Sequence, residues 1–81
     1  MDPEAIFVLM LDSFAEGEFD IASDSAQALV NWLRNGGFPP AVHVTCGSEL
    51  FAPTHAAANR SIAFAVANEI LARANSALAG P

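Results

Sequence analysis

Gly17-Glu18-Phe19-Asp20-Ile21-Ala22 is the stretch that decides the fold, because it places a glycine break between two segments that both fit helices. Glycine readily adopts the left-handed conformation that commonly ends a helix. The sequence therefore predicts a chain reversal at Gly17 and an antiparallel helical hairpin. We expect the remaining residues to complete a single all-α domain of three helices over residues 1–81, with a long C-terminal helix.

The first helix is expected to run from Pro3 to about Glu16. Asp2 suits the N-cap, proline suits the first helical position, and Glu4 favours the positive end of the helix dipole. Residues 6–11 are all apolar, however, and such a run fits a buried strand equally well. If they form a helix, it is apolar on nearly every side and has to be covered on more than one face.

The second helix is expected to begin near Asp20 or Ser23, which can both cap it, and to end at Asn35. Gly36-Gly37 stops it, and Phe38 is expected to fold back on the last turn. One face carries a stripe of apolar residues: Ala22, Ala26, Leu29 and Leu33. We expect Leu29 and Leu33 to be buried against the first helix.

The third helix is expected from about His55 to Ala79, with Thr54 as its cap and Gly80-Pro81 at its end. A broad stripe of apolar residues keeps close to a four-residue spacing: Ile62, Val66, Ile70, Ala74 and Leu78, with Ala63, Ala67 and Leu71 beside them. Small side chains in this stripe allow a close helix–helix approach. We expect the Leu71–Leu78 end to extend past the hairpin and to face a second subunit.

Residues 41–53 are the ambiguous part of the chain. Branched residues in the segment 41–45 favour a strand, but a strand there has a partner only if residues 5–11 also form one. We interpret residues 41–53 as an extended connector with a helical turn at 48–51. The alternative is a small α+β fold, β-α-β-α, with strands at 5–11 and 41–45 around a helix at 23–35.

The stretch Gly17-x-Phe19-Asp20-x-Ala22 resembles the turn and second-helix start of a tetratricopeptide hairpin. The resemblance covers one hairpin at most. Ala26 stands where that family prefers an aromatic residue, and Arg34 stands near the position where the family prefers a closing proline. One copy cannot build a peptide-binding groove, so the resemblance implies no binding residues.

The composition is apolar and acidic. Hydrophobic residues make up 53% of the chain and charged residues 15%, and the net charge is −6. So small a domain cannot easily bury this much apolar surface, which predicts a homo-oligomer. The only basic residues besides histidine are Arg34, Arg60 and Arg73. Because they lie far apart in the sequence, we expect no nucleic-acid binding.

The sequence favours a cytoplasmic protein. Cys46 is the only cysteine, so no intrachain disulfide can form. The N-terminus opens with acidic residues, where a signal peptide needs basic ones. The apolar run at 5–11 is far shorter than a membrane span, and we expect no membrane association. Abundant alanine, with arginine but no lysine, is typical of GC-rich coding sequences and indicates a bacterial or phage source.

His43, Cys46 and His55 are weak candidates for a metal site, with Glu49 or Asp12 as a fourth ligand. Cys46 beside either histidine could also act as a nucleophile. The spacing matches no standard zinc motif, so we expect no metal, cofactor or catalytic residue. Four carboxylates surround the first turn, and a solvated helix end explains them: Asp12, Glu16, Glu18 and Asp20.

Four apolar residues are predicted to lie at an interface. Trp32 is offset from the apolar stripe of its helix, and Phe38 follows a Gly-Gly turn, so the pair either anchors a partner or seals the hairpin edge. Leu71 and Leu78 lie on the part of the third helix that is expected to overhang the hairpin.

Function is inferred by elimination, because no cluster of residues carries a recognisable chemistry. The leading hypothesis is a small acidic, non-enzymatic protein–protein interaction domain that self-associates. One alternative is a small metal-binding protein or Cys/His-dependent enzyme using His43, Cys46 and His55. The other is a phage or mobile-element accessory protein that binds a host protein.

Overall fold

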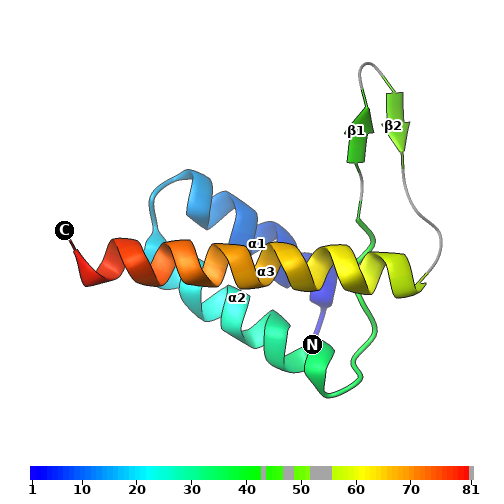
Figure 1. The fold of residues 1–81 in the computed structure, drawn as a ribbon, viewed down its shortest axis with the longest axis horizontal. Helices are drawn as coiled ribbons and strands as arrows, with labels where there is room; N and C mark the ends of the chain where they lie inside the picture. Colours follow the sequence, from blue (N-terminus) through cyan, green and yellow to red (C-terminus); the bar gives the residue numbers. More distant parts are fainter. Residues whose placement is uncertain (43, 47–48, 52–55, 81) are drawn as a thin grey trace.

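Three helices form an all-α domain, as the sequence predicts. The computed structural model describes residues 1–42, 44–46, 49–51 and 56–80. Their elements follow in the order α1 (Pro3–Ala15), α2 (Phe19–Arg34), β1 (Val44–Cys46), β2 (Glu49–Phe51) and α3 (Ala56–Ala79). Helices α1 and α2 form the hairpin, and the long α3 lies across both of them, running back toward the turn (Figure 1).

The start of α1 depends on Asp2. Its carboxylate accepts hydrogen bonds from the backbone N–H groups of Glu4 at 3.1 Å and Ala5 at 3.2 Å. These bonds satisfy two of the donors that a helix leaves free at its N-terminus. Residues 5–11 are therefore helical, and the β-α-β-α alternative is wrong.

The hairpin turn is a Schellman motif, a helix end closed by a left-handed residue and two reverse hydrogen bonds. Gly17 has φ 78°, as the sequence predicts. The N–H of Glu18 donates to the carbonyl oxygen of Ser13 at 2.8 Å, and the N–H of Gly17 donates to that of Phe14 at 3.2 Å. The local backbone thus ends α1 and reverses the chain without help from α3.

Replacing Gly17 by valine is expected to lower the free energy of unfolding by about 1–2 kcal/mol, because a β-branched side chain is strained at positive φ. Nothing lies within 4 Å of a Cβ built at this glycine, so the cost is conformational and involves no clash. Urea denaturation of the variant measures it. Gly17→Asn is the matched control and should cost less, because asparagine tolerates this conformation; equal losses would contradict the interpretation.

Helix α2 begins earlier than the sequence predicts. Glu18 is its N-cap residue and makes no side-chain capping bond, while Asp20 and Ser23 lie inside the helix. The turn itself supplies the reason: it places the Glu18 carbonyl oxygen where the N–H of Ala22 donates to it at 3.0 Å. The hydroxyl of Ser23 instead donates to Oδ1 of Asn75 on α3 at 2.6 Å.

The core lies where α2 packs between α1 and α3. Leu29 and Leu33 are buried as predicted, and the fully buried residues of α1 are Pro3 and Met10. On α3 the buried stripe is mostly the alanine one: Ala63, Ala67, Ile70 and Ala74. The larger residues predicted for its centre, Ile62 and Val66, are only partly buried, because alanine allows the closest approach to the alanines of α2.

The connector is partly β. Strands β1 and β2 pair antiparallel, with Val44 opposite Phe51, Thr45 opposite Leu50 and Cys46 opposite Glu49. The prediction that a strand here needs residues 5–11 as its partner is wrong, because the partner is the next segment of the chain. The helical turn expected at 48–51 is also wrong for residues 49–51. The expected cap Thr54 and the expected first helical residue His55 lie outside the described residues.

Candidate interaction surfaces

The outer side of α1 is an exposed apolar surface, which we call the α1 outer face. It consists of Val8, Leu9 and Leu11, whose side chains are 55%, 45% and 38% exposed. The opposite side of the same helix is buried through Met10 and Ser13. Neither α2 nor α3 covers the outer face. The sequence predicts that this helix has to be covered on more than one face, and within one molecule only one side of it is buried.

Carboxylates lie on the α1 outer face as well. Glu4, Asp12 and Glu16 are all exposed and follow the apolar residues at helical spacing. No arginine lies on α1. At about 100° per residue these carboxylates share the face of the apolar residues, and Glu4 and Asp12 lie one turn before and one turn after Val8. Any surface that covers this face therefore meets both apolar side chains and negative charge.

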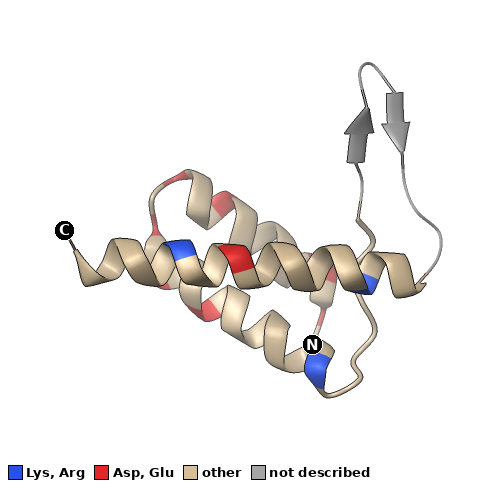
Figure 2. Cartoon of the chain, viewed as in Figure 1, with Lys and Arg blue, Asp and Glu red and all other residues tan. Residues whose placement is uncertain are grey.

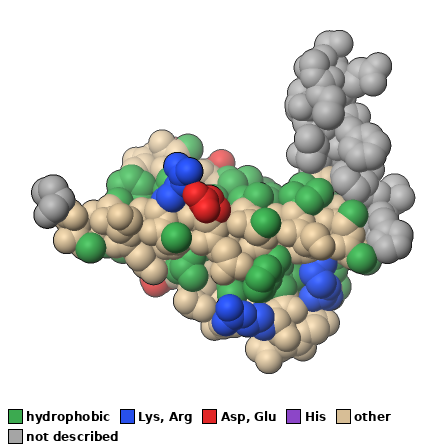
Figure 3. Space-filling view, in the orientation of Figure 1, with side chains coloured by type: hydrophobic (Ala, Val, Ile, Leu, Met, Phe, Trp, Pro, Cys, Tyr) green, Lys and Arg blue, Asp and Glu red, His purple; other side chains and the backbone are tan. Residues whose placement is uncertain are grey.

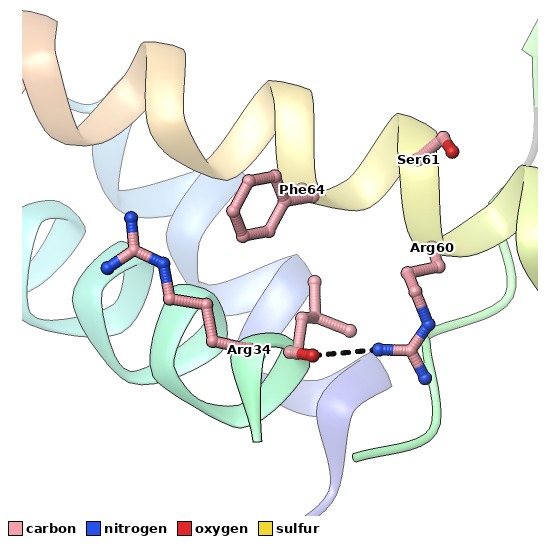
Figure 4. A pocket seen from close by; sticks show the side chains of 5 residues that line it. Arg34, Arg60, Ser61 and Phe64 are labelled. Atoms are coloured by element: carbon pink, nitrogen blue, oxygen red, sulfur yellow. Dashed lines mark hydrogen bonds between the residues drawn. The ribbon is translucent and has the colours of Figure 1, made fainter. Parts of the chain in front are cut away.

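A second surface feature is an open pocket of about 320 Å³ between the end of α2 and the start of α3. Figure 4 shows the ring of Phe64 between two guanidinium groups, Arg34 from α2 and Arg60 from α3. Leu33 and Ser61 complete the lining. We call this feature the arginine pocket.

Arg60 fixes the end of α2. Its Nη1 donates to the carbonyl oxygen of Leu33 at 2.8 Å and its Nη2 to that of Gly37 at 2.7 Å. Carbonyl groups at a helix C-terminus lack intrahelical partners and carry partial negative charge, which a guanidinium neutralises. Arg60 thus bridges α3 to the end of α2.

Arg34 contacts the other side of the pocket. Its Cζ lies 5.8 Å from the centroid of the Phe64 ring, within the range of a cation–π interaction. Its side chain is exposed, and the hydrogen bonds found among the described residues include none from it. The guanidinium therefore keeps its donors available on the surface.

Within the described part of the chain, no acidic side chain forms a salt bridge with either pocket arginine. Among the described residues the salt bridge is Arg73 to Glu69, at 2.6 Å on the exposed side of α3. Figure 3 shows the basic side chains of the pocket on either side of an apolar surface, at a distance from the Arg73–Glu69 pair. The sequence does not reveal that Arg34 and Arg60 line one pocket. Arg34 lies in the last turn of α2 and Arg60 near the start of α3. The antiparallel packing of the two helices brings these turns side by side (Figure 1), and a sequence argument would have had to assume that packing.

The predicted interface pair Trp32 and Phe38 forms a structural contact at the end of α2. The indole N–H of Trp32 donates to the carbonyl oxygen of Phe38 at 2.8 Å, and the two ring centroids lie 5.6 Å apart at 82°. Phe38 folds back as predicted, yet its side chain stays 62% exposed. Trp32 seals this edge, and an additional interface role for the pair stays a prediction.

The other two predicted interface residues differ in environment. Leu71 packs partly against the core, whereas Leu78 is 55% exposed. Beyond Ala74, the last buried residue of α3, residues 75–80 are all exposed, and the helix end projects past the hairpin turn (Figure 1). The expected overhang is present, and its pairing with a second subunit stays a prediction.

The alternative of a metal or nucleophile site at His43, Cys46 and His55 stays a hypothesis. His43 and His55 lie outside the described residues, and the side chain of Cys46 is not described. Within the described part, no three histidine, cysteine or acidic side chains are placed to hold a metal ion. Asp12, Glu16, Glu18 and Asp20 are exposed, and Figure 2 shows the acidic residues around the hairpin turn.

Comparison with known proteins adds no relative. No family model, curated protein or solved structure matches this chain. The tetratricopeptide resemblance therefore stays a likeness of one turn. Among the described helices, none combines the length and the apolar character needed to cross a membrane.

Proposed function

We propose that this chain is a small acidic protein–protein interaction domain that associates with a second copy of itself through α1. The α1 outer face carries this proposal, because Val8, Leu9 and Leu11 expose three large apolar side chains to water within one turn of the helix. Single exposed apolar residues are ordinary, but contiguous groups of them mark interaction surfaces. The high apolar content of the chain supports the same conclusion.

The expected affinity is modest. Covering one of these half-exposed side chains stabilises a complex by about 1 kcal/mol, and each copy contributes three of them. Bringing two molecules together costs at least about 4 kcal/mol in lost freedom of motion. The surplus of about 2 kcal/mol is smaller than the roughly 4 kcal/mol that a millimolar dissociation constant requires. The surface buried around the three side chains has to supply the rest, so we expect association in the millimolar range.

Salt should strengthen this contact. In a symmetric dimer the carboxylates of Glu4, Asp12 and Glu16 approach the same groups of the second copy. Dissolved ions screen this repulsion, and the burial of apolar side chains does not depend on it. The dissociation constant of the α1 contact is therefore expected to fall as ionic strength rises.

Val8→Glu together with Leu9→Glu is expected to abolish the self-association, because it places charges at the centre of the apolar face. The measurement is average mass by light scattering, from about 10 µM to 1 mM. Gln27→Glu is the matched control, since it adds negative charge at an exposed position of α2. A wild-type mass of 8.4 kDa at every concentration and salt would overturn the proposal, as would equal association of the α1 variant.

A further inference from the structure

The arginine pocket concentrates positive charge in an acidic protein. It holds two of the three arginines of a chain whose net charge is −6. Helix α1 begins at the same end of the bundle (Figure 1), but its Asp2 and Glu4 do not line the pocket. Asp2 is occupied in capping α1. The pocket is thus locally basic within a negative surface.

Both guanidinium groups retain hydrogen-bond donors. Each has five N–H donors in a planar fork that matches a carboxylate. Arg60 uses donors on Nη1 and Nη2 for two backbone carbonyls, and among the described residues the interaction found for Arg34 is its contact with the ring of Phe64. With Leu33 and Phe64 between them, the chemistry that fits is a carboxylate next to an apolar side chain.

The opposite end of the molecule presents that chemistry. At the hairpin turn, Glu16, Glu18 and Asp20 are exposed, and Ile21 beside them is 39% exposed. Helix α2 separates this turn from the pocket with 16 residues, a length of about 24 Å. The two features therefore cannot meet within one molecule.

We propose that the hairpin turn of one copy docks in the arginine pocket of the next, with turn carboxylates at Arg34 and Arg60 and Ile21 toward Phe64. The charges are complementary, and a convex turn fits a pocket that is open to solvent, whereas a small ligand is normally enclosed on most sides. This proposal rests on the proposed function in that both require self-association. It assigns a second contact, which is head-to-tail and can link more than two copies.

The two contacts respond to salt in opposite ways, which separates them. Ion pairs at a surface weaken as ionic strength rises, whereas the α1 contact strengthens. The test therefore uses the Val8→Glu, Leu9→Glu chain as background and measures its average mass at about 20 mM and 500 mM salt. We expect this background to associate at low salt only.

Charge reversal then tests the named groups. In the same background, Arg34→Glu and Glu18→Arg should each weaken the low-salt association about tenfold or more. Mixing the two variants should restore it, because each supplies the charge that the other lacks. Arg73→Glu is the matched control for Arg34→Glu, since it makes the same charge change away from the pocket.

Several outcomes would overturn the head-to-tail contact while leaving the α1 contact standing. In one of them the Val8→Glu, Leu9→Glu chain is monomeric at low salt, although the wild-type chain associates at high salt. Another is a loss of association with Arg34→Glu that is restored by mixing with none of the three turn variants Glu16→Arg, Glu18→Arg and Asp20→Arg, which would mean that Arg34 pairs with a carboxylate outside the turn. The converse result would instead reject the α1 contact. In that case the Val8→Glu, Leu9→Glu chain associates at low salt, and the wild-type chain is monomeric at high salt.

Discussion

Leu29→Ala is expected to lower the free energy of unfolding by about 2–5 kcal/mol, the range for removing a buried leucine side chain. Leu29 has no exposed surface and belongs to the core between the three helices. Neighbouring backbone cannot close the gap cheaply, because the packed helices would have to move together. For a domain this small, such a loss is a large part of the total stability. Urea denaturation followed by circular dichroism measures it.

Leu78→Ala is the matched control for this prediction. The residue has the same side chain and also lies in a helix, but it is 55% exposed at the projecting end of α3. Its replacement should change the free energy of unfolding by less than about 0.5 kcal/mol. Similar losses for the two variants would mean that Leu29 does not lie in the core. A concentration-dependent loss for Leu78→Ala would instead place that leucine at an interface.

Gly37→Ala is expected to cost about 1–3 kcal/mol, because it forces a side chain into occupied space. A Cβ at Gly37 would lie 2.3 Å from Cε2 of Trp32 and 2.4 Å from its Cδ2. Carbon atoms do not approach so closely, so the indole ring has to leave its position. Its hydrogen bond to Phe38 and the edge-to-face ring contact are then lost together.

Tryptophan fluorescence reports the change directly, because Trp32 is the only tryptophan in the chain. We expect its emission to shift to longer wavelength in Gly37→Ala as the ring becomes more exposed. In a Trp32→Ala background the same glycine substitution should cost almost nothing, since the obstructing ring is absent. A double-mutant cycle with no coupling between the two positions would contradict this account.

The elements that depend on neighbouring residues could be predicted from the sequence. Asp2, Gly17 and Gly36-Gly37 act through the backbone within a few residues, so their spacing alone locates the ends of α1 and α2. The start of α2 is the exception. The Schellman turn begins that helix through backbone bonds, and neither Asp20 nor Ser23 is needed as a cap.

Features that depend on tertiary packing could not be predicted in the same way. The alanine stripe of α3 became the buried one because alanine also faces it from α2, and a single helix does not reveal its partner. The arginine pocket is similar, since Arg34 and Arg60 meet only through the antiparallel packing of two helices. Short apolar runs are ambiguous because the sequence does not show which segment they pack against. Strand β1 pairs with β2, the next segment of the chain.

Arg60 has a consequence for the long connection between α2 and α3. Its bonds to Leu33 and Gly37 hold together the two points where the chain leaves the bundle and returns to it. The segment between them is therefore a closed loop whose closure entropy varies only with the logarithm of its length, by about 0.6 kcal/mol for each doubling. We therefore expect changes in the length of this connection to cost little stability and to leave α2 packed against α3.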